Sequence, residues 1–205
     1  MIGEQNGQAS VEPWAGSGAP YEPYDARVSA QQWAQRLLQR RDWLLLDTET
    51  TGLDSRAEVV QIGVLSTAGD ALLDVLVRQR YPIPLAATDI LGITDAMVAQ
   101  ALTYPEVHAQ LDMLVRGKTV VAYNAGFDAR LLRQTALIHR TGDLLVLWQC
   151  AMEQYARYVG RWSNRHGHFM WQPLPRQGAA ALAKHQAIDD CRATLDLIRQ
   201  MAGGA

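Results

Sequence analysis

Residues 43–53 read WLLLDTETTGL, an apolar run that ends in two carboxylates. A continuous apolar run is typical of a central strand that is covered on both faces. Because side chains alternate along a strand, Asp47 and Glu49 are expected to point to the same face. Two carboxylates on one face repel each other unless a cation lies between them, and Mg²⁺ or Mn²⁺ prefers oxygen ligands. An isolated Asp-x-Glu motif is also typical of a strand end that reaches solvent. A metal site therefore needs further acidic residues from elsewhere in the chain.

A second group of polar residues follows the next apolar strand, which is predicted over Thr119–Tyr123. The segment 124–128 reads NAGFD and begins an amphipathic helix expected over about Ala125–His139. Asn124 and Asp128 would share one side of the first turn. Both residue types are also common helix caps. If the two strands are neighbours, Phe127 and Asp128 would lie at the same edge of the sheet as Asp47.

A third group lies at the start of the last predicted helix, Ala187–Met201. It reads HQAIDD over residues 185–190. Helical spacing alone pairs His185 with Asp189, four residues apart. A capping or surface role is the alternative for each of these side chains.

The order of the predicted elements indicates the fold class. Three strands come first and are followed by alternating strands and helices, which predicts an α/β protein with a mixed sheet. Ser29 is expected to cap a first helix that ends near Arg41. The other expected elements are strands at 58–66, 71–77 and 144–147, helices at 95–100, 105–116 and from 148 to about 158, and irregular chain at 160–178.

The amino-acid composition limits the class of protein and its domain organisation. The 205 residues are 48% hydrophobic and 20% charged with a net charge of −2, as in ordinary globular proteins. We expect a flexible N-terminal tail at 1–28, rich in Gly and Pro, and a single domain at 29–205. No apolar stretch approaches the roughly 20 residues of a membrane span, and no secretory leader is evident. These features predict a soluble, cytoplasmic protein without a membrane partner.

Together the three groups resemble the DEDDh (DnaQ-like) family of 3′–5′ exonucleases, which includes polymerase proofreading subunits and ribonuclease T. The first family motif is DTETTGL at 47–53, the second is N-x-x-F-D at 124–128, and the third is H-x-A-x-x-D at 185–190. All three occur in family order, and the similarity covers about residues 42–202.

The resemblance implies a ribonuclease H-like fold with a mixed central β-sheet flanked by helices. It also implies two divalent ions, Mg²⁺ or Mn²⁺, and it selects Asp190 rather than Asp189 as a ligand. His185 takes the general-base position. The implied metal ligands are Asp47, Glu49, Asp128 and Asp190.

The implied activity is metal-dependent hydrolysis of phosphodiester bonds from the 3′ end of single-stranded or frayed DNA or RNA, releasing 5′-mononucleotides by a two-metal mechanism. The motifs do not separate proofreading, DNA repair and RNA trimming, and a polymerase or another protein is a candidate partner. The alternative is a non-catalytic module on the same scaffold that binds nucleic acid or a protein. All five expected catalytic positions are filled, which favours the enzyme.

Substrate contacts follow from the same resemblance. Thr50 and the backbone of Thr48 and Glu49 would contact the 3′-hydroxyl end. Leu53 would act as a wedge against a base, and Phe127 would pack near the terminal base. Asn124 is a further substrate-binding candidate. Core packing is the alternative for Leu53 and Phe127.

Two features depart from the family pattern or extend it. Leu91 stands where many members have a His in an H-G-I-T loop. Residues 155–171 interleave Arg with aromatic residues, as a groove for single-stranded nucleic acid requires, although a loop folded back on the core is the alternative.

Charge is also uneven along the chain, since residues 1–128 carry a net −7 and residues 129–205 a net +5, and 17 of the 19 cations are Arg.

Overall fold

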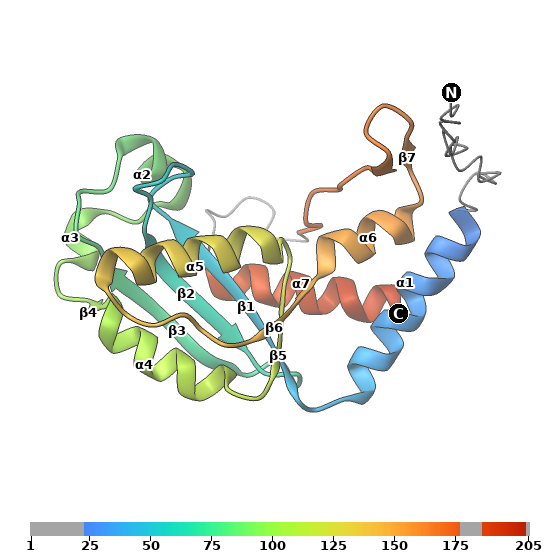
Figure 1. Ribbon diagram of the computed structural model, residues 1–205, viewed down its shortest axis with the longest axis horizontal. Coiled ribbons are helices and arrows are strands. Elements are labelled where there is room, and N and C mark those ends of the chain that lie inside the picture. Colours follow the sequence, from blue (N-terminus) through green and yellow to red (C-terminus); the bar gives the residue numbers. More distant parts are fainter. Residues whose placement is uncertain (1–22, 177–185, 204–205) are drawn as a thin grey trace, which may run out of the picture.

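The computed structural model describes residues 23–176 and 186–203 (Figure 1). Its main sheet has six strands in the order β4-β3-β2-β1-β5-β6. These are β1 (Trp43–Thr50), β2 (Val59–Leu65), β3 (Ala71–Arg78), β4 (Leu102–Thr103), β5 (Thr119–Ala122) and β6 (Leu147–Cys150). The first three strands form an antiparallel meander, whereas β5 and β6 run parallel to β1 and β4 runs parallel to β3. The predicted α/β class with a mixed sheet is confirmed.

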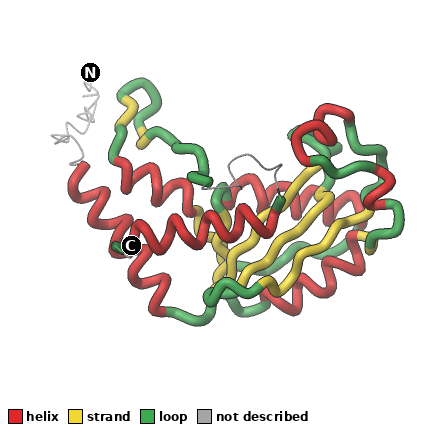
Figure 2. Tube along the Cα trace, turned by 180° about the vertical axis from the view of Figure 1, so that it is seen from behind, coloured by secondary structure: helices red, strands yellow, loops and turns green. Residues whose placement is uncertain are grey.

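Helices cover both faces of this sheet. They are α1 (Pro23–Gln39), α2 (Leu85–Leu91), α3 (Asp95–Val98), α4 (Tyr104–Val115), α5 (Ala125–His139), α6 (Ala151–Val159) and α7 (Ala187–Met201). Seen from behind, α7 lies across the sheet (Figure 2). No helix among the described residues combines the length and the apolar composition that a bilayer span requires.

Alternation along β1 explains how one apolar run serves two cores. Leu44 and Leu46 pack with α4 and α5 on one face of the sheet. Trp43 and Leu45 pack with α1, α6 and α7 on the other face. A central strand covered on both faces therefore needs the continuous apolar run that the sequence shows.

The structure differs from the predictions of local structure in several places. The first helix begins at Pro23 rather than Ser29, and its Ala26 is buried in a cluster with α6, so tertiary packing extends it. Residues 1–22 of the predicted tail lie outside the described residues. The short helix α2 was not predicted. The strand predicted at 144–147 is β6, and it pairs with β5 over residues 147–150 instead. Leu144 and Val146 pack against the core, but they precede the residues that pair with β5. Residues 160–178 contain a small hairpin, β7 (Trp162–Ser163) and β8 (His168–Phe169).

Candidate active site

A close approach between β2 and α7 positions the first acids. In the β1–β2 ladder, Asp47 lies opposite Gly63. A Cβ atom added at Gly63 would lie 2.7 Å from the backbone of Ala187 and Ile188. Only glycine at position 63 allows the start of α7 to lie this close to the sheet. This close approach brings Asp190, in the first turn of α7, near the carboxylates of β1.

The structure gathers three of the predicted acids into one cluster. One carboxylate oxygen from each of Asp47, Glu49 and Asp190 lies within 4.8 Å of the others. Glu49 and Asp190 are buried, at 7% exposure each, and Asp47 is half-buried. Three carboxylates at this separation, shielded from water, strongly favour a bound cation.

The fourth acid, Asp128, lies in the first turn of α5 and is held from β1. Its Oδ1 accepts hydrogen bonds from the Thr48 backbone N–H at 3.0 Å and from the Thr48 hydroxyl at 2.8 Å. Asp128 lines the same cavity as the three clustered acids. Asn124 is the N-cap residue of α5, yet its side chain makes no capping hydrogen bond and faces the cavity instead. Asn124 thus occupies the capping position that the sequence offered as an alternative, but its side chain forms no capping hydrogen bond.

Electrostatics mark this group as a site that requires positive charge. Burial, reinforced by the Asp190 carboxylate, raises the pKa of Glu49 to about 8. Burial raises the pKa of Asp128 to about 7, against the lowering effect of its bonds from Thr48. Burial and the neighbouring acids also raise the pKa of Asp47 well above its ordinary value. Burial first, and repulsion between the carboxylates second, thus make their charged forms unfavourable when no cation is present.

The carboxylate oxygens of this cluster are suitable ligands for a divalent ion. Glu49 Oε1 is buried and has no hydrogen-bond partner among the described residues. A buried, unpartnered carboxylate oxygen is costly, and a hard cation is the ligand that would satisfy it beside two further carboxylates. We therefore place divalent-metal binding at Asp47, Glu49 and Asp190.

A cation that the sequence motifs did not identify faces this cluster. Arg176 Nε donates to Asp190 Oδ1 at 2.8 Å, and Arg176 Nη2 donates to Oδ2 at 2.5 Å. Arg176 lies on irregular chain more than ten residues before α7, so no periodic signal could have identified it. The cavity has a volume of about 440 Å³ and is lined by Asp47, Thr48, Glu49, Tyr123, Asn124, Phe127, Asp128, Pro173, Leu174, Arg176 and Asp190.

The predicted substrate residues separate into two sets. Thr48, Asn124 and Phe127 line the cavity. Thr50 lies outside the lining, where its hydroxyl donates to the Gly52 carbonyl at 2.9 Å. Leu53 is 76% exposed, so core packing is wrong for it. Phe127 is partly buried and packs against the core as well as lining the cavity.

His185 and Leu91 are the remaining positions that the family motifs single out. His185, predicted as the general base, lies outside the described residues. Leu91, which stands where many family members have His, is buried in a small apolar cluster with Ile83 and Ile93. Its side chain therefore serves packing and offers no polar contact.

Comparison with known proteins decides the family. The exonuclease family model (RNase_T) matches residues 44–198, which contain all of β1 except Trp43, most of α7 and the four predicted metal ligands. The chain belongs to this exonuclease family. Membership of the DEDDh, DnaQ-like group, predicted from the three motifs, is confirmed, and so are the 3′–5′ exonuclease activity and the enzyme class.

Relatives of this exonuclease include phage and bacterial proteins. It is 38% identical over 173 residues to an uncharacterised exonuclease of Escherichia phage 186, covering 80% of this chain and 89% of the relative. It is 26% identical over 166 residues to the DNA polymerase III subunit epsilon of Treponema pallidum, covering 76% of this chain and 74% of that protein.

Solved structures confirm the fold. Exonuclease X in complex with 5′ overhanging duplex DNA matches with a TM-score of 0.53 and 26% identity, over 80% of this chain and 94% of that one. The nuclease domain of 3′hExo, a DEDDh family member bound to rAMP, matches with a TM-score of 0.57 and 14% identity, over 79% and 92%. The predicted ribonuclease H-like architecture is therefore confirmed.

Proposed function

We propose that this exonuclease removes nucleotides one at a time from the 3′ end of single-stranded or frayed DNA and releases 5′-mononucleotides. The observation that carries the proposal is the largely buried cluster of Asp47, Glu49 and Asp190, in which one Glu49 oxygen has no hydrogen-bond partner among the described residues. Such a site binds a cation and, through it, an anionic phosphodiester. The similarity to a structure bound to DNA supports DNA as the polymer, and RNA is a comparison arm of the test.

The proposed roles of the side chains follow from their positions. Asp47, Glu49 and Asp190 would hold metal, and Asp128, oriented by Thr48, would complete the ligand set. Bound Mg²⁺ or Mn²⁺, two ions in this proposal, supplies Lewis acidity that lowers the pKa of a water and stabilises charge on the leaving 3′ oxygen. His185 would accept the proton of the attacking water, since its ordinary pKa near 6.5 suits a base at neutral pH.

The cavity walls would position the terminal nucleotide. Phe127 and Tyr123 face the cavity from the start of α5 and the end of β5. Their rings suit packing against a sugar or a base. Thr48 and Asn124 are candidate polar contacts in this proposal, Thr50 is a contact to the 3′-hydroxyl end, and the exposed Leu53 is a wedge against a base.

The test uses 5′-labelled single-stranded DNA and RNA oligonucleotides with Mg²⁺ or Mn²⁺. We expect a ladder that shortens from the 3′ end, and its loss in the Asp47→Ala and His185→Ala variants and after chelation. The ratio of DNA to RNA rates decides the polymer. A wild-type protein that is folded and metal-loaded but cleaves neither polymer would refute the proposal.

The protein partner is a separate proposal. Similarity to a polymerase III epsilon subunit makes a replicative polymerase the partner to test first. Co-elution of the full chain with a polymerase on gel filtration would support a proofreading role. Separate elution at micromolar concentrations would favour repair or processing by the exonuclease alone.

A further inference from the structure

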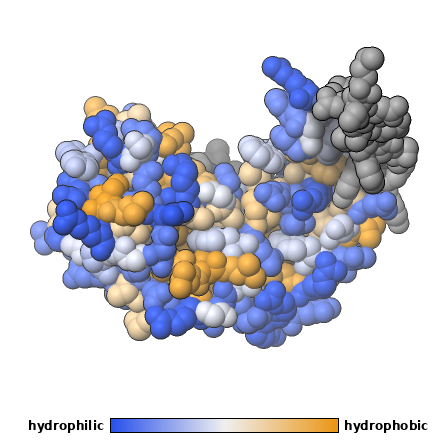
Figure 3. Space-filling model, in the orientation of Figure 1, coloured by the Kyte–Doolittle hydropathy of each residue, from blue (hydrophilic) through white to orange (hydrophobic). Residues whose placement is uncertain are grey.

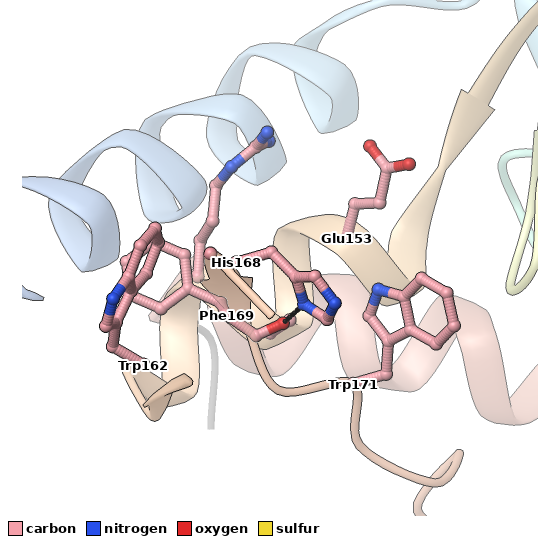
Figure 4. Close-up of a pocket in the computed structure, with 8 residues that line it drawn as sticks. Glu153, Trp162, His168, Phe169 and Trp171 are labelled. Carbon is pink, nitrogen blue, oxygen red and sulfur yellow. Dashed lines mark hydrogen bonds between the residues drawn. The ribbon is translucent and has the colours of Figure 1, made fainter. Parts of the chain in front are cut away.

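An aromatic pocket lies outside the acidic cavity, between α6 and the β7–β8 hairpin. Its volume is about 480 Å³, and its lining includes Glu153, Arg157, Trp162, His168, Phe169 and Trp171. Figure 4 shows the His168 and Trp171 rings beside each other and the Trp162 and Phe169 rings together at the opposite end of the pocket. Its described lining shares no residue with that of the acidic cavity.

The rings form flat surfaces that are already assembled. The His168 and Trp171 rings stack with centroids 5.4 Å apart and planes 20° apart. The His166 ring stacks on His168 at 5.7 Å. Trp162 meets Phe169 edge-on at 5.1 Å. Exposed aromatic faces of this kind offer stacking surfaces for flat ligands.

These surfaces are exposed although the hairpin is anchored. Phe169 is buried against Ala26 of α1 and Ala156 of α6, and the Met170 N–H donates to the Arg161 carbonyl at 2.7 Å. Yet Trp171 is 63% exposed and Trp162 is 43% exposed. A fixed hairpin that leaves Trp171 largely exposed points to a ligand rather than to core packing. The core-packing alternative therefore holds for Phe169, Tyr155 and Tyr158 but not for Trp171.

Charge on the hairpin selects the ligand class. Residues 155–171 contain Arg157, Arg161 and Arg165 and no Asp or Glu. Among the described residues, Glu153 is the one acid that lines the pocket, at its α6 side. Aromatic faces interleaved with guanidinium groups match bases alternating with phosphates, which is the composition of single-stranded nucleic acid.

The chain itself connects this pocket to the active site. Trp171 lines the aromatic pocket, and Pro173, Leu174 and Arg176 line the acidic cavity. The Tyr123 hydroxyl donates to the Gln172 carbonyl at 2.5 Å. This hydrogen bond holds the segment 171–176 against the end of β5. Five residues span at most about 18 Å, which is roughly five stacked nucleotides. The space-filling view shows a hollow between the hairpin end and the α2–α3 end of the molecule (Figure 3).

We propose that the aromatic pocket is a second nucleotide subsite, which stacks a base of the single strand a few nucleotides on the 5′ side of the scissile bond. The inference rests on the proposed function for the direction of the strand. It adds a source of affinity that depends on substrate length and that is separate from the metal site.

The first test measures binding without chemistry. Fluorescence anisotropy of labelled single-stranded oligo-dT, two to twelve nucleotides long, is followed in EDTA with the full chain and with Trp171→Ala. We expect wild-type affinity to rise once the strand is about four to six nucleotides long, and Trp171→Ala to lose about 10-fold on the longer strands. Trp171→Phe should restore most of the loss. Met170→Ala is the matched control, since Met170 is also exposed but does not line the pocket.

The second test separates the two sites. The p-nitrophenyl ester of thymidine 5′-monophosphate fills only the active site, whereas a twelve-nucleotide strand reaches both. We expect the KM of Trp171→Ala to rise on the strand and not on the ester. Equal losses on both substrates, or unchanged strand binding in EDTA, would overturn the subsite. If wild type binds the strand through Trp171 but cleaves neither substrate, the proposed function fails while the subsite stands.

Discussion

Arg176 forms an ion pair with Asp190, which is also a proposed metal ligand. Its Nε and Nη2 both donate to Asp190, one of the three clustered carboxylates. In the metal-free protein this pair offsets part of the repulsion among the acids. The same pair must weaken metal binding, because a cation and a guanidinium compete for the Asp190 oxygens.

We therefore predict that Arg176→Gln binds Mn²⁺ about 10-fold more tightly than wild type, measured by isothermal titration calorimetry at pH 8. The matched control is Arg192→Gln, because Arg192 pairs with the adjacent Asp189 on the exposed side of α7. That control should leave the affinity unchanged. Weaker Mn²⁺ binding in Arg176→Gln would show instead that the guanidinium helps to order the ligands.

Glu49 provides a second prediction. One of its oxygens has no hydrogen-bond partner in the described part of the chain, and burial raises its pKa, so its charge is unfavourable in the fold without a cation. Glu49→Gln should lower exonuclease activity at least 100-fold and, in EDTA at pH 8, raise the melting temperature by a few degrees. Asp89→Asn, on α2, should change neither quantity. A Glu49→Gln variant with wild-type activity would remove this residue from the metal ligands.

The contact between α7 and β2 predicts a larger effect on stability. In Gly63→Ala, the added methyl group would lie 2.7 Å from the backbone of Ala187 and Ile188, so the start of α7 must move away from the sheet. We expect a loss of about 2–4 kcal/mol in the free energy of unfolding and a fall in activity, because Asp190 moves with the helix. Urea denaturation measures the first and the oligonucleotide assay the second.

Gly142→Ala is the control, since no atom of the described residues lies within 4 Å of the added methyl group. It should remain within about 0.5 kcal/mol of wild type. Equal stability of the Gly63 and Gly142 variants would show that the contact between α7 and β2 adapts easily.

The strands and helices that could be predicted are those whose own residues carry the signal. The β1 run, the β2–β3 hairpin, α5 and α7 were placed to within a few residues, because burial on one or both faces imposes a periodic pattern. The start of α1, the register of β6 and the β7–β8 hairpin depend on contacts with distant segments. No local period encodes such contacts, so they were misplaced.

The site was predictable to the same extent. Motif order identified Asp47, Glu49, Asp128 and Asp190, all of which line one cavity in the structure. Arg176 and Tyr123 could not be identified, since each reaches the cavity from irregular chain or a strand end through the tertiary fold. The Arg and aromatic content of 155–171 was visible in the sequence, whereas the stacking of His168 on Trp171 was not.

The two halves of the chain meet at the site with opposite charge. Residues 1–128 carry a net −7 and residues 129–205 a net +5. Three of the four acids come from the first half, and the Arg-containing hairpin comes from the second. In the proposed complex a polyanionic strand would thus meet arginines at the hairpin, beside the single acid Glu153, and clustered acids at the metal site, where a metal ion would neutralise them.

This arrangement makes the stability of the protein depend on pH and metal together. Glu49 titrates near pH 8 and Asp128 near pH 7 in the fold, while both titrate near 4 to 4.5 when the chain is unfolded. Between these limits the folded state binds more protons than the unfolded state, so the free energy of unfolding falls as pH rises. Without metal, we expect the melting temperature to fall between about pH 5 and pH 8.

Divalent metal should reverse this trend, because metal binds the deprotonated carboxylates and displaces their protons. Differential scanning fluorimetry in EDTA and in saturating Mn²⁺ gives the two profiles, and the stabilisation by Mn²⁺ should be larger at pH 8 than at pH 5. The double variant Glu49→Gln, Asp128→Asn should flatten both profiles and so separates these acids from the other titrating groups. A melting temperature in EDTA that rises steadily from pH 5 to pH 8 in wild type would contradict the electrostatic account of the site.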